Sequence, residues 1–173
     1  KGVKAAYKTK SGDALNIGNL THEWLEKAIK WKLGEGDAPE KPTNEGVINA
    51  VDAFREWVKE NDVKWISSEE KLYNRDHKYA GTVDAIAEIN GEYCVIDWKT
   101  SRAIYPEYYL QVAAYAKAVE EMKGRPVDAT YILRCDKVTG MFEAARSTDP
   151  ELSENFKAFL SAKFLFHRMK ELK

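Results

Sequence analysis

The stretch GTVDAIAEINGEYCVIDWKTS, residues 81–101, limits the possible folds more than any other part of the chain. The dipeptide Asn90-Gly91 stands between two β-prone runs, and both residues tolerate the positive φ of a type I′ turn. The stretch therefore predicts a β-hairpin. Counting outward from its turn places Asp84 directly opposite Asp97.

Two carboxylates that face each other across paired strands have Cβ atoms roughly 5 Å apart and destabilise the pairing. Lys99 follows Asp97 by two residues, so the strand period places its side chain on the same face. An exposed ion pair between Asp97 and Lys99 would contribute roughly 0 to 1 kcal/mol and leaves Asp84 unexplained. A divalent cation between the carboxylates reverses the sign of their interaction, because hard cations prefer clustered oxygen ligands.

We therefore expect Mg2+ or Mn2+ to be held by Asp84, Asp97 and the backbone carbonyl of Trp98. Such an ion polarises a phosphate and lowers the pKa of a bound water. Lys99 would orient or deprotonate that water and stabilise charge on the phosphoryl oxygens. The pattern indicates phosphodiester hydrolysis. The alternative, a structural calcium site, usually recruits roughly six to eight oxygens, often from one acidic loop, and the sequence has no such loop.

Apolar spacing and turn signals divide the rest of the chain into helices and strands. Helical spacing runs from Asn19 to about Leu33, and a second helical run is capped by Thr43 and ends near Asn61. The other expected elements are strands at 64–73 and in the hairpin, a helix at 106–124, strands at 129–135 and 141–145, and a final helix from 150. The order ααβββαββα predicts one α/β domain over residues 1–173, with a mixed central β-sheet flanked by helices.

The composition, with 44% hydrophobic and 32% charged residues, is that of an ordinary globular protein and excludes a disordered chain. The net charge of -1 argues against a broadly basic nucleic-acid binder but permits a local basic groove. Cys94 and Cys135 are expected to be small buried residues, too few for a cysteine-only zinc or iron–sulfur site. No signal peptide or long apolar span is visible, so we expect a cytoplasmic protein without a membrane partner.

Three motifs follow one another along the central part of the chain: GTVD at 81–84, IDWKTS at 96–101 and QVAAYAKA at 111–118. In this order and spacing they resemble the G-x-x-D, D-x-K and Q-x-x-x-Y motifs of the PD-(D/E)XK nuclease superfamily, in its RecB-like branch. The run is particularly similar to the mitochondrial genome-maintenance exonucleases and to small phage and archaeal exonucleases. The resemblance implies a restriction-endonuclease-like core and a metal-dependent deoxyribonuclease.

The resemblance also implies roles for residues outside the hairpin. His22 matches the family's N-terminal histidine, which adds a side-chain ligand to the metal; its position alone indicates a histidine at the core edge. Glu69 takes the place of an acidic residue that some relatives carry upstream of G-x-x-D, with Glu70 as the neighbouring alternative. Gln111 and Tyr115 share one helix face, where they would contact the active site and place the nucleic acid, or else form an ordinary amphipathic edge.

Further candidates for DNA binding follow the D-x-K motif. Ser101 and Arg102 offer a hydroxyl and a guanidinium to phosphate, with a solvated strand end as the alternative. Tyr105, Tyr108 and Tyr109 are candidates for stacking on unpaired bases, worth roughly 1 to 3 kcal/mol per base, and we expect at least one of them in the core. The N-terminal lysines either track a nucleic-acid backbone or form a solvated tail: Lys1, Lys4, Lys8 and Lys10. Four tryptophans are expected to pack in the interior: Trp24, Trp31, Trp57 and Trp65.

By the same resemblance we expect an exonuclease that acts on single-stranded or free DNA ends in DNA repair, replication or phage DNA processing. The chain has no G-x-x-x-x-G-K-[ST] loop, so unwinding would belong to a separate helicase or replication protein. The alternatives are a structure-specific endonuclease and a non-catalytic nucleic-acid-binding module of the same fold. The intact set of Asp84, Asp97 and Lys99 disfavours the non-catalytic module.

Overall fold

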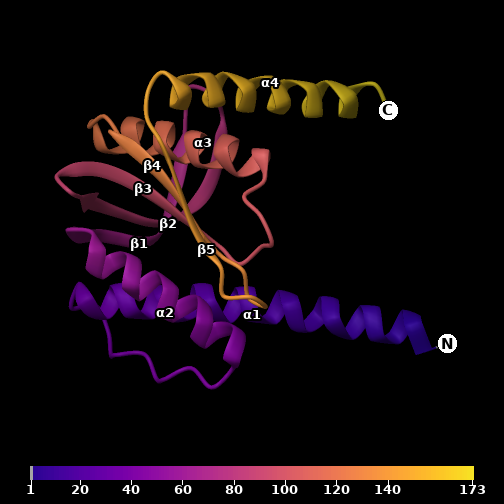
Figure 1. Ribbon diagram of the computed structural model, residues 1–173. Helices are drawn as coiled ribbons and strands as arrows, with labels where there is room; N and C mark the ends of the chain where they lie inside the picture. The colour runs from indigo at the N-terminus through magenta and orange to yellow at the C-terminus, as the bar shows by residue number, and fades with distance from the viewer. Residues whose placement is uncertain (1) are drawn as a thin grey trace.

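The computed structural model describes the backbone of residues 2–173 and the side chains of residues 16–173. Its elements follow the order ααβββαββα expected from the sequence (Figure 1). Their bounds are α1 (Gly2–Lys32), α2 (Glu45–Glu60), β1 (Val63–Asn74), β2 (Tyr79–Ile89), β3 (Glu92–Lys99), α3 (Pro106–Lys123), β4 (Ala129–Cys135), β5 (Phe142–Ser147) and α4 (Glu151–Glu171).

The five strands form one mixed sheet in the order β1-β2-β3-β4-β5. β3 and β4 are parallel, with α3 as the crossover between them, and the other neighbours are antiparallel. α1 and α2 pack on one face of the sheet, whereas α3 covers the other face and α4 packs against α3 (Figure 1). The predicted α/β architecture, a mixed sheet flanked by helices, is confirmed.

The β2–β3 hairpin forms at the turn that the sequence predicts. Asn90 and Gly91 have φ values of 52° and 85°, the left-handed conformation that a type I′ turn requires. The antiparallel ladder then continues without a slip to the pair Ala85 and Ile96. The register of the two strands is therefore set by local turn chemistry.

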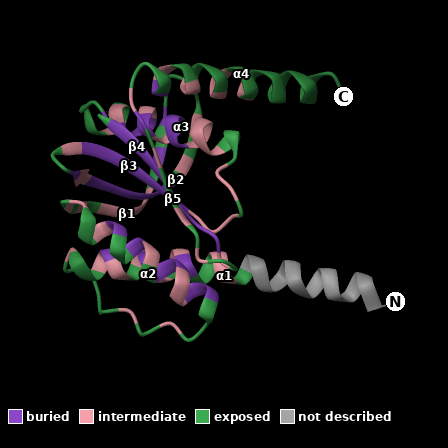
Figure 2. Ribbon diagram, in the orientation of Figure 1, coloured by how far each residue is buried: buried purple, intermediate pink, exposed green. Residues whose placement is uncertain are grey.

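Two apolar layers hold the helices on the sheet, whose central strands are buried (Figure 2). The layer beneath α1 and α2 includes Leu25, Ile29, Phe54, Trp57 and Trp98. The layer beneath α3 includes Ile86, Val95, Ala116, Val119 and Leu152. Cys94 and Cys135 are buried free thiols, as expected.

Three local expectations were wrong. Asn44, rather than Thr43, caps α2, because its side chain accepts hydrogen bonds from the backbone N–H groups of Gly46 and Val47. The first helix begins at Gly2, well before the apolar spacing that marked Asn19. Trp31 is 46% exposed, because it lies near the end of α1 with the Lys32 ammonium 4.8 Å from its ring centroid.

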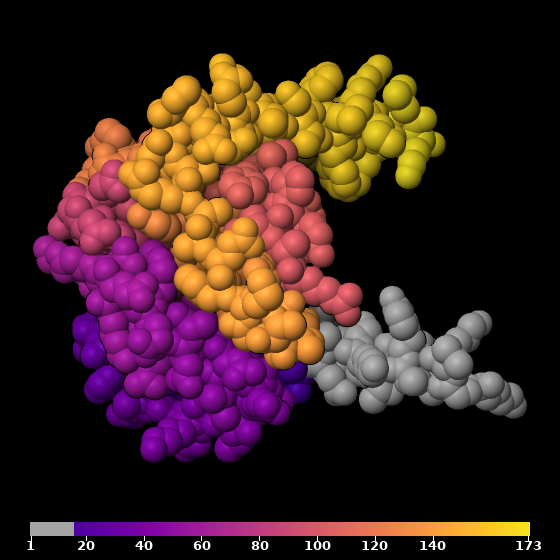
Figure 3. Space-filling model, in the orientation of Figure 1, coloured from indigo at the N-terminus to yellow at the C-terminus, as the bar shows by residue number. Residues whose placement is uncertain are grey.

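The last turns of α4 project beyond the body of the molecule (Figures 1 and 3). They carry exposed apolar side chains: Phe164, Leu165, Phe166, Met169 and Leu172. Basic residues lie among and beside them in the sequence: Lys163, Arg168, Lys170 and Lys173. Within the part of the chain that the structure describes, no helix is both long and apolar enough to span a lipid bilayer.

Candidate active site

Three acidic residues lie in a row across three adjacent strands. Glu69 on β1 stands opposite Asp84 on β2, because the residues on either side of both are paired in that register. The β2–β3 ladder, continued one step beyond Ala85 and Ile96, places Asp84 opposite Asp97. The juxtaposition expected from the turn therefore holds, and Glu69 extends it to a third carboxylate.

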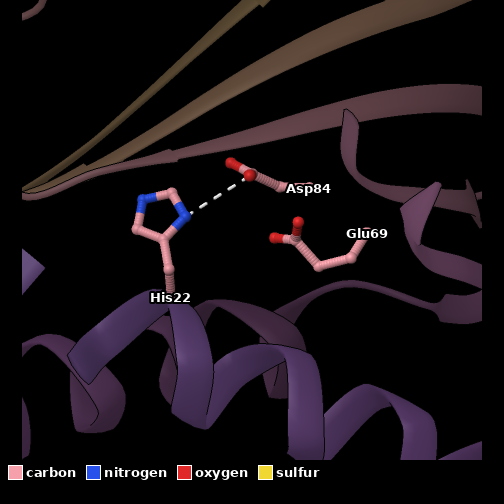
Figure 4. Close-up of side chains that lie close together, drawn as sticks. All are labelled: His22, Glu69 and Asp84. Atoms are coloured by element: carbon pink, nitrogen blue, oxygen red, sulfur yellow. Dashed lines mark ion pairs between the residues drawn. The ribbon is translucent and has the colours of Figure 1, made fainter. Parts of the chain in front are cut away.

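Glu69 adopts a left-handed backbone conformation inside a strand, with φ of 51°. For a residue with a side chain this conformation costs about 1–2 kcal/mol, and such strain gathers where surrounding structure imposes it at a functional site. The Glu69 carboxylate points toward His22 and Asp84 (Figure 4). Glu70, the alternative left open by the sequence, instead forms an ion pair with Lys123 of α3. Of the two acids, Glu69 is therefore the one that lies beside His22 and Asp84.

His22 approaches the acids from α1. Its Nδ1 lies 3.3 Å from Oδ1 of Asp84 (Figure 4). The ligand atoms of His22, Glu69 and Asp84 lie within 4.8 Å of one another, a spacing that suits a shared metal ion. Burial lowers the pKa of His22, but the hydrogen bond and charge of Asp84, together with the charge of Asp97, outweigh it and raise the pKa. The carboxylates of Asp84 and Asp97 therefore favour the protonated form of the His22 imidazole.

The cavity at this cluster is open to solvent and acidic. Its walls are Asn19, His22, Glu23, Glu26, Glu69, Thr82 and Asp84. Of these described residues, none carries a fixed positive charge. Burial and then the charge of Asp84 raise the pKa of Glu69, since ionised carboxylates so close together repel one another. A cation in the cavity would relieve that repulsion.

Asp84 and Asp97 are held by the backbone and by Lys99. Oδ2 of Asp84 accepts a hydrogen bond of 2.7 Å from the backbone N–H of Trp98. Asp97 is 3% exposed, and its Oδ2 lies 2.8 Å from Nζ of Lys99 but is aligned with no hydrogen-bond donor among the described residues. Burial and the charge of Asp84 raise the pKa of the Asp97 carboxyl to about 7, although Lys99 acts in the opposite direction.

These observations fit a divalent metal ion. Oδ2 of Asp97 is a buried carboxylate oxygen without an aligned donor, and a cluster of one imidazole and two carboxylates lies beside it. Asp97 itself is not part of that cluster, because its carboxylate is turned to Lys99. The predicted role of the Trp98 carbonyl stays a prediction.

Lys99 is anchored to α3 by a short chain of hydrogen bonds. Its ammonium donates to Oε1 of Gln111 at 2.9 Å, and Nε2 of Gln111 donates to the Tyr115 hydroxyl at 2.9 Å. The four-residue spacing of Gln111 and Tyr115 allows both to reach the same point from one helix face. Gly81 makes this possible, because a Cβ there would lie 2.7 Å from Cε1 of Tyr115. Sequence reasoning missed this contact between two of the motifs.

Lys99 also lies next to one ring of an aromatic pair. Its ammonium lies 4.6 Å from the centroid of the Tyr108 ring, and Tyr105 meets Tyr108 edge-on with centroids 5.5 Å apart. Tyr105 is 40% exposed, and Tyr108 and Tyr109 are half-buried, so the expectation of a core tyrosine among them was wrong. The buried stretch of α3 begins only at Val112, after all three.

The remaining DNA-binding candidates lie on the loop after β3 or outside the described side chains. The Ser101 hydroxyl donates to the Ala103 carbonyl at 2.8 Å, so it is engaged within the loop. Arg102 is exposed beside the D-x-K motif. The lysines at positions 1, 4, 8 and 10 lie outside the residues whose side chains are described. Phosphate binding by these groups stays a prediction.

A comparison with protein families shows to which family the chain belongs. A model of the PD-(D/E)XK nuclease superfamily matches residues 50–170, well over half of the chain and including Glu69, Asp84, Asp97 and Lys99. The chain belongs to the PD-(D/E)XK nuclease superfamily. PD-(D/E)XK nucleases generally use divalent metal ions, in keeping with the acidic cluster described above.

Two curated relatives match shorter stretches of this PD-(D/E)XK chain. Mitochondrial genome maintenance exonuclease 1 from Mus musculus is 48% identical over 48 residues, which cover 24% of this chain and 14% of that protein. The protein of the same name from Xenopus tropicalis is 39% identical over 59 residues, which cover 31% of this chain and 17% of that protein. The matches thus span less than a fifth of the length of either relative.

One solved structure shares the fold of this chain over almost its whole length. The crystal structure of a candidate exonuclease from Eubacterium rectale has a TM-score of 0.57 and 13% sequence identity, and the alignment covers 90% of this chain and 68% of that one. At this identity the likeness concerns the fold alone. The restriction-endonuclease-like core expected from the motifs agrees with it.

Proposed function

We propose that this protein is a metal-dependent deoxyribonuclease that hydrolyses DNA phosphodiester bonds as an exonuclease on single-stranded ends. The observation that carries the proposal is the row of Glu69, Asp84 and Asp97 with Lys99 beside it. Like charges directly opposite one another destabilise a sheet, so the arrangement needs a ligand to account for it. Membership of the nuclease superfamily supports a cation and a phosphate as that ligand.

Mg2+ or Mn2+ is the proposed cofactor. His22, Glu69 and Asp84 would form its ligand cluster, and we propose that Asp97 and the Trp98 carbonyl complete it from the neighbouring strand β3. Carboxylate and carbonyl oxygens suit both ions, and imidazole is a common ligand of transition metals. The ion supplies Lewis-acid polarisation of the phosphate and activation of water.

Lys99 is the proposed catalytic side chain. Its ammonium, held between Asp97 and Gln111, orients the attacking water and neutralises charge that develops on the phosphoryl oxygens. In the reaction the attacking water loses a proton to solvent as its oxygen bonds to phosphorus, the bond to the leaving sugar oxygen breaks, and that oxygen takes up a proton from solvent. Tyr115, acting through Gln111, keeps Lys99 in place, which matters because a displacement of about 1 Å can lower a rate about 100-fold.

The exonuclease mode is supported by the names of the relatives, whose matched stretches are short. We propose that the exposed faces of Tyr105 and Tyr108 stack on unpaired bases next to Lys99 and that Arg102 contacts a phosphate. A separate helicase or replication protein would open duplex DNA. Such an end-directed activity suits DNA repair, replication or phage DNA processing.

Cleavage of three substrates tests the proposal: end-labelled single-stranded DNA, linear duplex and closed circular DNA, each with Mn2+, Mg2+ or chelator. Lys99→Ala is the inactive control. Lys117→Ala, on the same helix as Gln111 but paired with Glu120, is the matched lysine control.

We expect metal-dependent loss of linear single strands, with the circle spared and the Lys117 variant fully active. Nicking of the circle would replace the exonuclease mode with an endonuclease. DNA binding without cleavage under every metal condition would favour the non-catalytic module.

A further inference from the structure

Arg134 is a buried cation that the chemistry above does not use. It lies on β4 in register with Lys99 on the parallel strand β3, and it is 4% exposed. Its Nε and Nη2 lie 3.2 Å and 3.1 Å from Oε2 of Glu143, the residue opposite on β5. The Glu143 side chain is 53% exposed, so water screens this ion pair strongly. Glu143 therefore orients the guanidinium, but the ion pair does not explain why the arginine charge is buried.

The remaining edge of the guanidinium faces the loop that joins β3 to α3. Nη1 of Arg134 donates to the backbone carbonyls of Ser101 at 3.3 Å and Arg102 at 3.1 Å. Among the described residues, positions 101–104 take part in no backbone–backbone hydrogen bond. Arg134 therefore supplies the donors that fix two successive peptide groups of an otherwise irregular loop.

That loop connects Lys99, the proposed active-site lysine, to the helix whose side chains contact it. It begins directly after Lys99 and leads into α3 at Pro106. Tyr108 and Gln111, in the first turns of α3, return to the Lys99 ammonium. The path of the loop, which reaches the molecular surface in Figure 3, thus sets where these two residues meet Lys99. A contact that fixes the loop therefore also fixes the two residues that contact Lys99.

We propose that Arg134 is a positioning residue that holds the 100–105 loop and thereby places Lys99 against Gln111 and Tyr108. The effect on cleavage rests on the proposed function, whereas the effect on the loop does not. Lysine at position 134 keeps the charge but cannot reach two carbonyls and Glu143 together, because it lacks the planar fork of arginine. Arg134→Lys therefore disrupts the joint contact to the loop and Glu143 while keeping the charge, and Arg134→Met removes both the contact and the charge.

Limited trypsin digestion tests the loop without reference to activity. Arg102 is exposed in the loop, so the rate of cleavage between Arg102 and Ala103 reports how often the loop leaves its place. We expect both Arg134 variants to raise this rate about tenfold relative to cleavage after Lys163 on α4, since local opening limits proteolysis. Arg146→Lys on β5, where Arg146 pairs with Glu92, is the matched control and should leave the rate unchanged.

Cleavage of single-stranded DNA with Mn2+ tests the link to Lys99. At a temperature where circular dichroism shows each variant folded, Arg134→Lys should lower kcat about 10- to 100-fold with KM within about threefold of the wild type. If Arg134→Met does not fold, the trypsin cleavage rate and kcat of Arg134→Lys alone are compared with those of the wild type.

An unchanged trypsin rate would overturn the proposal, and so would an open loop with full kcat. A wild-type protein without any cleavage would remove the proposed function, and the trypsin rate would then decide the loop contact alone.

Discussion

Replacing Asp97 by asparagine should stabilise the metal-free protein above pH 7. The pKa of this buried carboxyl is raised from its ordinary 3.8 to about 7. At about 1.36 kcal/mol per pKa unit, its ionisation in the fold costs on the order of 4 kcal/mol relative to the unfolded chain. The uncharged amide of the variant avoids that cost but is buried with incomplete hydrogen bonds, which costs about 1–3 kcal/mol. We expect a net gain of about 1–3 kcal/mol, or about 2–12 °C in Tm for a chain of this size.

The pH dependence follows from the sign of the same shift. Because the folded-state pKa is raised, the stability contributed by protonated Asp97 is complete below pH 3.8 and is lost as the pH rises through about 7. In chelator the wild type should therefore lose stability over this range relative to Asp97→Asn. Added Mn2+ should make the wild type more stable than Asp97→Asn at pH 8, since an ion that binds the folded wild type better stabilises it by mass action.

Urea or thermal unfolding at pH 5 and pH 8, with chelator and with Mn2+, measures these differences. Asp52→Asn on α2 is the matched control, because Asp52 is 64% exposed and its neutralisation should change little. If Asp97→Asn unfolds at a lower temperature than the wild type in chelator at pH 8, burial of the Asp97 charge does not destabilise the fold. Equal stabilisation of both proteins by Mn2+ would show that the Asp97 charge does not help to bind the ion.

Three further substitutions give distinct outcomes. Lys99→Ala should reduce cleavage by about 100-fold or more in a protein that still folds and binds DNA, measured by single-turnover kinetics, circular dichroism and anisotropy; residual activity near the wild type would exclude Lys99 from the chemistry. Gly81→Ala should displace the Tyr115 ring, lower stability by about 1–3 kcal/mol and reduce cleavage, measured by urea unfolding and the same assay. Unaltered unfolding and activity would show that the ring moves freely. Asn44→Ala should cost about 1 kcal/mol in urea unfolding with cleavage intact, and a loss of activity would mean that this cap acts on the site.

The parts of the fold that the sequence predicted are those set by local chemistry. Asn90-Gly91 fixed the hairpin and its register, and with them the opposition of Asp84 and Asp97. α3 begins at Pro106 and its C-cap is Gly124, in the left-handed conformation, where proline and glycine predicted both ends.

The parts that the sequence left open depend on packing between distant segments. Glu69 lies beside Asp84 and Asp97 with its backbone in a left-handed conformation, and no residue pattern in the sequence predicts that conformation. His22 reaches Asp84 only once α1 packs against the sheet, so its spacing alone indicated a core-edge residue. Arg134 escaped notice because both carbonyls it holds lie more than 30 positions away in the chain. Long-range contacts of this kind leave no periodic trace in the sequence.

We propose that Glu69, Asp84, Asp97 and Lys99 form a metal-dependent nuclease site. The most direct test compares cleavage of end-labelled single-stranded DNA by the wild type and Asp84→Asn, with Mn2+ and with chelator. Glu88→Gln, at a half-buried acid on the same strand that pairs with Lys64, is the control. We expect the wild type and Glu88→Gln to cleave in Mn2+ but not in chelator, and Asp84→Asn not to cleave. Cleavage in chelator, or by Asp84→Asn at the wild-type rate, would show that this site is not a metal-dependent nuclease site.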